Sequence, residues 1–276
     1  MKYHEIIRVL TEEPLLLTPA AHASLVRLFE EHRTLEAAEF KAKREGLDWC
    51  GNEVELDQME ITEEGTAIIP IGGPIGVKLG KFEKGAGAVD SADVIEELDA
   101  AEENANVTDI LLDIDSPGGM VNGTPELADR ILAVEKPIYA FTSGMMCSAA
   151  YWVGCAADFV FATRSADIGS IGVYCPILDS SEQMKTRGLK VEVIASDPLK
   201  GIGVPGTSLS DAQRTFLKEH VDAIAQMFKE HVYQMRGGAL DSLDMQGQSF
   251  LAEMAIKKQL IDEIVDCRET VLELIR

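Results

Sequence analysis

The sequence lacks any excess of basic residues, since 25 Lys and Arg stand against 47 Asp and Glu and the formal net charge is −22. Such a chain cannot neutralise many phosphates, so we expect no direct nucleic-acid partner. Long apolar runs are also missing, and none approaches the ~20 residues of a membrane-spanning helix. The N-terminal segment carries Glu5, Glu12 and Glu13, where a signal peptide would be apolar. These absences predict a cytoplasmic protein without a membrane anchor.

The cysteines are few, odd in number, widely spread and without a C-x-x-C pair. This pattern indicates neither a disulfide framework nor a zinc site, so we expect free thiols at Cys50, Cys147, Cys155, Cys175 and Cys267. No P-loop or H-E-x-x-H motif occurs either. The sequence therefore predicts no cofactor and no bound metal.

Strand and helix patterns alternate along the chain from residue 66 onward. The expected elements are strand 66–71, helix 91–104 capped by Ser91, strand 107–114, helix 124–135, strand 137–142, helix 148–158, strands 158–163, 170–174 and 190–195, and helix 210–236 after Ser210. This alternation of strands and helices predicts the α/β class, with a mainly parallel sheet and flanking helices.

Ahead of the alternating region, Thr18 and Pro19 form a good cap and first turn for an amphipathic helix over 18–44. An acidic stretch without clear periodicity then runs to about residue 65. We therefore expect a helical and acidic N-terminal extension over 1–65 and one main domain over 66–276.

Two strand-to-helix junctions have the composition of an active site. At the first, Asp115-Ser116-Pro117-Gly118-Gly119 directly follows an apolar strand, and adjacent glycines there allow a tight turn that exposes backbone N–H groups. In an open sheet this is also the edge where ligands bind, although a simple turn explains the motif as well.

The second junction is SGMMCSAAY, in which Ser148 precedes a helix of small residues. A serine at a helix N-terminus suits a nucleophile whose attack generates an oxyanion. The alternatives are that Ser148 only caps the helix, or that Cys147 is the nucleophile, although a lone cysteine here is more often a packing residue. A third junction holds Ser170 between Gly169 and Gly172, and the packing of a tight turn explains it adequately.

We expect a lysine, not a histidine, as the base that activates Ser148, because the stretch from residue 33 to 219 contains no histidine. A desolvated lysine can accept the serine proton near neutral pH. Between residues 137 and 217 the lysines are Lys185, Lys190 and Lys200. The first two flank Arg187 in a charged segment, whereas Lys200 lies in a Gly/Pro-rich loop and is the best placed of the three.

The ordered motifs LLDIDSPGG, SGMMCSAAYW, ADIGSIGVY and IASDPLKGIGVP resemble the signal peptide peptidase A family, Ser-Lys peptidases of the ClpP/crotonase-like fold. The resemblance implies that Ser148 is the nucleophile and Lys200 the dyad lysine. It also implies that the N–H groups of Gly119 and Ala149 form the oxyanion hole, and that substrate peptides bind extended beside the S-P-G-G segment.

Ser170 would then either orient the lysine amine or have no catalytic role. The sequence departs from the family pattern at Cys147, which precedes the nucleophile, and at Ala149 and Ala150, which follow it; these changes would reshape the pocket for the substrate side chain.

The N-terminal segment PLLLTPAAHASLVRLFE is similar to soluble members encoded in tailed phages and prophages. This similarity implies processing of head proteins, with capsid or scaffold proteins as partners, and the family implies a homo-oligomer. Two other classes stay open: a crotonase-type enzyme acting on acyl-CoA thioesters, and a non-catalytic scaffold that retains the peptidase fold.

Overall fold

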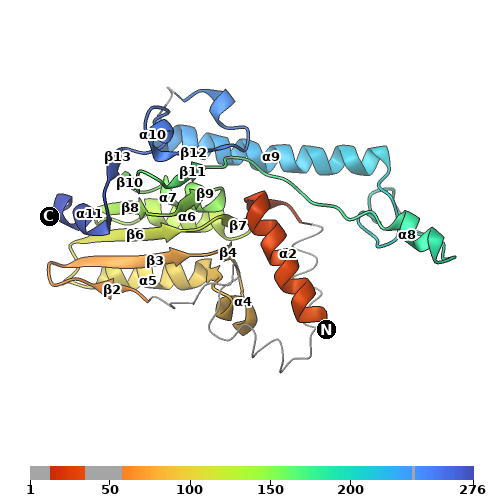
Figure 1. Cartoon of the computed structure of the whole chain (residues 1–276), viewed down its shortest axis with the longest axis horizontal. Helices are drawn as coiled ribbons and strands as arrows, with labels where there is room; N and C mark the ends of the chain where they lie inside the picture. The colour runs from red at the N-terminus through yellow and green to blue at the C-terminus, as the bar shows by residue number, and fades with distance from the viewer. Residues whose placement is uncertain (1–12, 35–57, 238–239) are drawn as a thin grey trace. The chain divides into compact units, whose positions relative to one another are not determined.

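The computed structural model describes residues 13–34, 58–237 and 240–276 (Figure 1). The chain divides into two compact units. The large unit comprises Leu16–Gly172 and Phe228–Arg276, and the small unit comprises Met1–Leu15 and Val173–Met227. The sequence-based boundary near residue 65 stays a prediction.

The large unit is built on a six-stranded sheet in the order β13-β10-β8-β6-β3-β2. Its strands are β2 (Glu60–Ile61), β3 (Thr66–Gly72), β6 (Asp109–Asp115), β8 (Ile138–Thr142), β10 (Phe159–Thr163) and β13 (Glu263–Val265). All neighbours pair in parallel except β2, which is antiparallel to β3. The expected α/β class with a mainly parallel sheet is confirmed.

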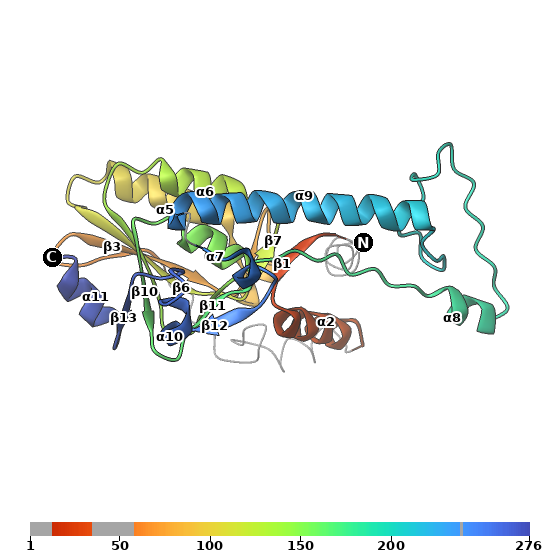
Figure 2. The same ribbon diagram turned by 90° about the horizontal axis from the view of Figure 1, so that it is seen from above.

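Helices cover both faces of this sheet (Figure 2). On one face lie α5 (Ser91–Glu103) and α6 (Thr124–Leu132), with α7 (Ala149–Gly154) against α6, and on the other lies α11 (Arg268–Leu274). Because side chains alternate along a strand, Leu111 and Phe141 pack with Val271 of α11, while their neighbours Leu112 and Ala140 point to the other face. Both faces are buried, which explains why these strands read as nearly continuous apolar runs.

Beyond the carboxyl ends of the main strands, the chain forms two smaller sheets. One has the order β12-β11-β9 and the other β1-β7-β4-β5. Their strands are β1 (Leu15–Leu17), β4 (Ile75–Gly76), β5 (Val89–Asp90), β7 (Gly118–Met120), β9 (Met145–Cys147), β11 (Asp167–Gly169) and β12 (Ser249–Leu251). The two junctions singled out from the sequence therefore continue into short strands, β7 after β6 and β9 after β8.

The remaining helices are α2 (Pro19–Thr34), α4 (Lys81–Gly85), α8 (Ser181–Thr186), α9 (Asp211–Arg236), α10 (Ala252–Ala255) and a 3₁₀ turn (Ser242–Asp244). Thr18 caps α2 as expected, since its Oγ1 accepts from the Ala21 N–H at 3.3 Å. The expected continuation to residue 44 lies outside the described residues. Ser210 and Gln213 form a reciprocal capping box at the start of α9, with bonds of 3.0 and 3.3 Å.

Three local expectations are wrong. Asp90, not Ser91, is the N-cap of α5, because its carboxylate accepts from the Ala92 N–H at 3.1 Å while Ser91 is the first helical residue. The segments 170–174 and 190–195 are not strands, although Tyr174 pairs with Leu15 as an isolated bridge. A β-rich composition does not make a strand where no neighbouring strand pairs along its length.

Within the large unit, a two-bond ion pair holds the end of α9 in place. Both guanidinium NH groups of Arg236 donate to the Asp262 carboxylate at 2.8 Å, and Asp262 also accepts from the Val160 N–H at 2.8 Å. The Arg236 side chain is only 8% exposed. Removing the carboxylate would leave a buried, unpaired charge.

We therefore expect Asp262→Ala to lower the free energy of unfolding by about 3 kcal/mol, as is usual when one partner of a buried pair is lost. Chemical denaturation of wild type and variant measures this. As a control, Glu253→Ala removes the exposed pair with Arg164 (3.8 Å) and should change stability by less than about 1 kcal/mol. Equal effects of the two variants would contradict this role for Asp262.

Within the described residues, no helix combines the length and the apolar character that crossing a membrane requires.

Candidate active site

Ser148 lies between β9 and α7 in a backbone conformation that is rare for a residue with a side chain. Its φ is 57° and its ψ −119°, the first corner of a type II′ turn, which glycine usually occupies. Its N–H donates to the Gly169 carbonyl at 2.7 Å, and its carbonyl accepts from the Tyr151 and Trp152 N–H groups at 2.9 and 3.0 Å. Such conformations cost about 1–3 kcal/mol and cluster at functional sites.

The Ser148 side chain does not cap the helix that follows it. It makes no capping hydrogen bond to α7, although its position is the N-cap. The alternative that Ser148 serves only as a helix cap therefore loses its physical basis. The residue is also only 1% exposed, so the candidate nucleophile is covered in this state.

The S-P-G-G turn lies directly beside Ser148. The Ser116 N–H donates to Met145 of β9 at 2.8 Å, and the Ser116 carbonyl accepts from the Cys147 N–H at 3.1 Å. Gly118 has a φ of 103°, and a Cβ built on it would come within 2.9 Å of the Ser148 Cβ. The two junctions identified in the sequence thus meet at one place in the fold.

The two predicted oxyanion donors, Gly119 and Ala149, lie at this same place. Ala149 is fully buried and is the first residue of α7, so its N–H has no acceptor within the helix. That nitrogen is 3.0 Å from the position of a Cβ built on Gly118. Gly119 pairs with Ile75 of β4, whose backbone leaves no space for a side chain. Their oxyanion role stays a prediction.

Sequence reasoning assigned no individual role to Gly118, the glycine that touches Ser148. Its conformation, the Leu16 carbonyl oxygen and the close approach of Ser148 leave no room for any side chain there. The pair of adjacent glycines in the motif was the sequence signal for these close contacts. Gly118 allows the backbone to approach Ser148, and Gly119 allows it to approach strand β4.

Ser170 lies across from Ser148 on the neighbouring strand. Gly169 of β11 is in register with Cys147 of β9, so each serine directly follows its strand. Ser170 also has a positive φ, 52°, is buried, and donates its N–H to the Gln248 carbonyl at 2.8 Å. Its proposed role in orienting a lysine stays a prediction.

Cys147 is poorly suited to act as the nucleophile. Burial, reinforced by the charges of Asp167 and Asp115, raises the pKa of its thiol to about 12. The thiol donates to the Asp167 carbonyl at 3.4 Å. Since the thiolate is the reactive form, Cys147 stays inert at neutral pH.

We expect Cys147→Ala to retain serine-directed fluorophosphonate labelling at a rate within about tenfold of wild type, since only a packing side chain is lost. The native thiol should also resist iodoacetamide up to about pH 9, because the folded pKa lies well above this and the thiol remains protonated. Peptide mapping measures the alkylation. Complete loss of labelling in a folded Cys147→Ala protein would contradict this assignment.

No histidine replaces the lysine as a base among the described residues near α7. His231 of α9 is half-buried, and burial lowers its pKa. Its Nε2 lies 3.1 Å from the Trp152 carbonyl oxygen, and its ring lies 5.8 Å from the Trp152 ring. This histidine therefore belongs to the packing of α9 on α7, where Phe228 also stacks on Trp152 at 4.7 Å.

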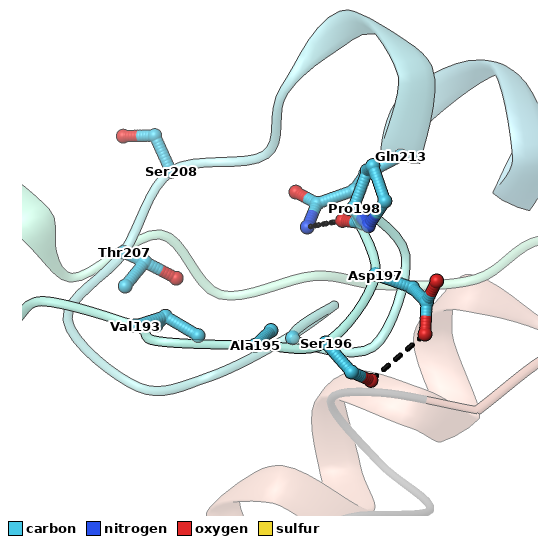
Figure 3. Close-up of a pocket in the computed structure, with 9 residues that line it drawn as sticks. Val193, Ala195, Ser196, Asp197, Pro198, Thr207, Ser208 and Gln213 are labelled. Carbon is cyan, nitrogen blue, oxygen red and sulfur yellow. Dashed lines mark hydrogen bonds between the residues drawn. The ribbon is translucent and has the colours of Figure 1, made fainter.

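Lys200 belongs to the small unit and Ser148 to the large unit. The Lys200 loop surrounds an open hollow, and the Gln213 amide closes the loop by donating to the Pro198 carbonyl at 3.1 Å (Figure 3). The Lys200 N–H donates to the Asp197 carbonyl at 3.1 Å, while its side chain is exposed.

Two protein-family models match segments of the chain that include Ser148. The family model of Clp protease matches residues 85–168, and that of Peptidase family S49 matches residues 130–275. The chain belongs to Peptidase family S49, the family that the motifs around Ser148 and Lys200 resemble.

Phage proteins are among the similar curated sequences. The capsid assembly protease C of Escherichia phage lambda is 31% identical over 210 residues, which cover 75% of this chain and 48% of that protein. The head-tail preconnector protein GP5 of Enterobacteria phage P21 is 28% identical over 210 residues, covering 75% and 42%. The chain thus spans about half the length of these relatives.

The solved structures that match this chain have lower sequence identity to it. An enoyl-CoA hydratase/isomerase family member has a TM-score of 0.48 at 16% identity, covering 79% of this chain and 74% of that one. A ClpP1 variant from Listeria monocytogenes has a TM-score of 0.47 at 14% identity, covering 73% and 92%.

Proposed function

We propose that this protein is a serine endopeptidase in which Ser148 is the acylating nucleophile and Lys200 the general base. The observation that carries the proposal is the strained Ser148 backbone, held against Gly118 without a capping bond, in a chain of Peptidase family S49. Strain of this kind persists only where the surroundings enforce it, which is typical of a nucleophile presented at a turn.

In the proposed reaction, the neutral amine of Lys200 takes the hydroxyl proton of Ser148 while Oγ bonds to the substrate carbonyl carbon. The N–H groups of Gly119 and Ala149 donate to the resulting oxyanion. The peptide C–N bond then breaks, and the lysine ammonium returns its proton to the leaving amine. Water, deprotonated by Lys200, hydrolyses the remaining ester and restores the serine hydroxyl.

A lysine that accepts a proton has to be shielded from water, whereas Lys200 is exposed in the single chain. Its neighbour Leu199 and the nearby Phe216 are exposed apolar side chains that line one hollow. We propose that assembly into a homo-oligomer, together with the bound peptide, covers this region. Exposed apolar surface of this kind is typical of an interaction site.

We further propose that the substrates are proteins of phage head assembly, processed in the host cytoplasm. The names of the phage lambda and phage P21 relatives support this substrate class. A net charge of −22 disfavours nucleic acid as the direct partner.

The test is incubation of the purified protein with a library of unstructured peptides, with mass spectrometry of new termini. Cleavage products that are absent with Ser148→Ala support the proposal. Turnover of acyl-CoA thioesters without peptide cleavage would replace it with the crotonase-type reaction, and no turnover of either substrate by folded protein would favour the scaffold.

A further inference from the structure

Strand β1 adds to the free side of β7, the strand that carries the S-P-G-G glycines. In the four-stranded sheet, β7 has β4 on one side and β1 on the other. Just after β1, the Thr18 N–H donates to the Pro117 carbonyl at 3.1 Å. An extended peptide is expected to bind along this same segment. The chain's own N-terminal strand therefore lies where a substrate strand would pair.

Within the large unit, this strand reaches the candidate nucleophile. A Cβ built on Gly118 would touch the Leu16 carbonyl oxygen, and it would lie 2.9 Å from the Ser148 Cβ. The same point lies 3.0 Å from the Ala149 nitrogen. A backbone carbonyl of β1 thus faces the group of atoms that the proposed mechanism needs around a substrate carbonyl.

Burial shows that β1 and Ser148 are both covered in this state. Leu15, Leu16 and Leu17 are 2%, 0% and 4% exposed, and Ser148 is 1% exposed. A serine that attacks a peptide bond has to be reached by that bond. A substrate strand therefore cannot pair with β7 while β1 occupies its present position beside β7.

Within the small unit, the beginning of the strand is fixed by a second pairing. The Leu15 N–H donates to the Tyr174 carbonyl at 2.7 Å, and the Tyr174 N–H donates back to the Leu15 carbonyl at 3.2 Å. Pairing by backbone groups alone is independent of side-chain identity, so another extended peptide could make the same bonds.

We propose that Leu15–Leu17 is a built-in occupant of the substrate strand, which has to withdraw before a protein substrate binds. This inference rests on the proposed peptidase function. It also names the substrate class: an extended segment of at least three uncharged, leucine-rich residues. In the chain, Pro14 and Pro19 bracket the segment, and because neither has an N–H to donate, they limit the paired length.

The competing account is a permanent structural strand, with substrates binding elsewhere. The two accounts differ in whether β1 has to separate from β7 before a substrate can bind. A reversible covalent lock distinguishes them, because residues that exchange both backbone bonds lie about 5.5 Å apart at Cα, within the range that a disulfide spans. The variant is Leu15→Cys with Tyr174→Cys, and the control is Tyr174→Cys alone.

The lock is placed in a Ser148→Ala background, so that binding is read without cleavage. The probe is a fluorescent peptide with the sequence of residues 13–19, EPLLLTP, and the measurement is its fluorescence polarisation. We expect oxidation to weaken binding about tenfold or more, since the lock removes the open state, and reduction to restore it. A probe with its leucines replaced by serine should bind weakly throughout.

Equal affinity in the oxidised and reduced double variant, with the disulfide verified by mass spectrometry, overturns the inference. Failure of the disulfide to form in folded protein also contradicts it, because the strand pairing would then be absent. Failure of the proposed function gives a different result: the wild type would bind the peptide without cleaving it.

Discussion

Replacing Ser148 by alanine is expected to reduce peptide cleavage by roughly 10⁴-fold or more, as loss of a nucleophile does in other serine peptidases. The hydroxyl oxygen forms the ester with the substrate, and the neighbouring Cys147 thiol cannot replace it, because it is buried and its pKa is raised to about 12. The measurement is kcat/KM on a peptide identified from the library.

The matched control is Ser143→Ala, in the turn between β8 and β9, five residues before Ser148. Ser143 is exposed, and its carbonyl, which accepts from the Thr163 hydroxyl at 3.1 Å, is unaffected by the substitution. This variant should keep wild-type activity. Wild-type turnover by folded Ser148→Ala would remove the nucleophile from the account.

Lys200→Ala should reduce kcat by roughly 10²- to 10⁴-fold, the usual contribution of a general base, with little change in KM. The effect falls on kcat because the amine moves a proton during the chemical step and does not hold the peptide in the ground state. Steady-state kinetics on the same peptide separate the two constants.

Lys190→Ala is the control, since Lys190 is another exposed lysine of the small unit. It should leave kcat unchanged. Equal losses in both variants would indicate a general effect of positive charge, and unchanged kcat in Lys200→Ala would require a different base.

Much of the fold was predictable because its strands are buried on both faces. The run Ala67–Ile71 of β3 is apolar throughout, and Pro125 lies in the first turn of α6, where proline is favoured. Both signals are local. The cap of α5 was misassigned by one residue because Asp90 and Ser91 are both good caps, and only the folded backbone shows which side chain reaches Ala92.

The candidate site was predictable in part. The motifs identified Ser148 and the glycine turn, and the fold brings them together because β6 and β8 are parallel neighbours whose carboxyl ends lie at the same edge. The positive φ of Ser148 and the pairing of β1 with β7 were not predictable, since both depend on contacts between segments far apart in the sequence. Three consecutive leucines at Leu15–Leu17 do not by themselves identify the strand with which they pair.

The most direct test of the Ser148–Lys200 dyad is intact-mass labelling of the purified protein with a fluorophosphonate, between about pH 6 and pH 10, beside Ser148→Ala and Lys200→Ala. We predict a single adduct on the wild type, formed faster as the pH rises because only a neutral amine can accept the serine proton. It should be missing from both variants. A folded wild-type protein that forms no adduct, or an adduct that survives in Ser148→Ala, would contradict the account.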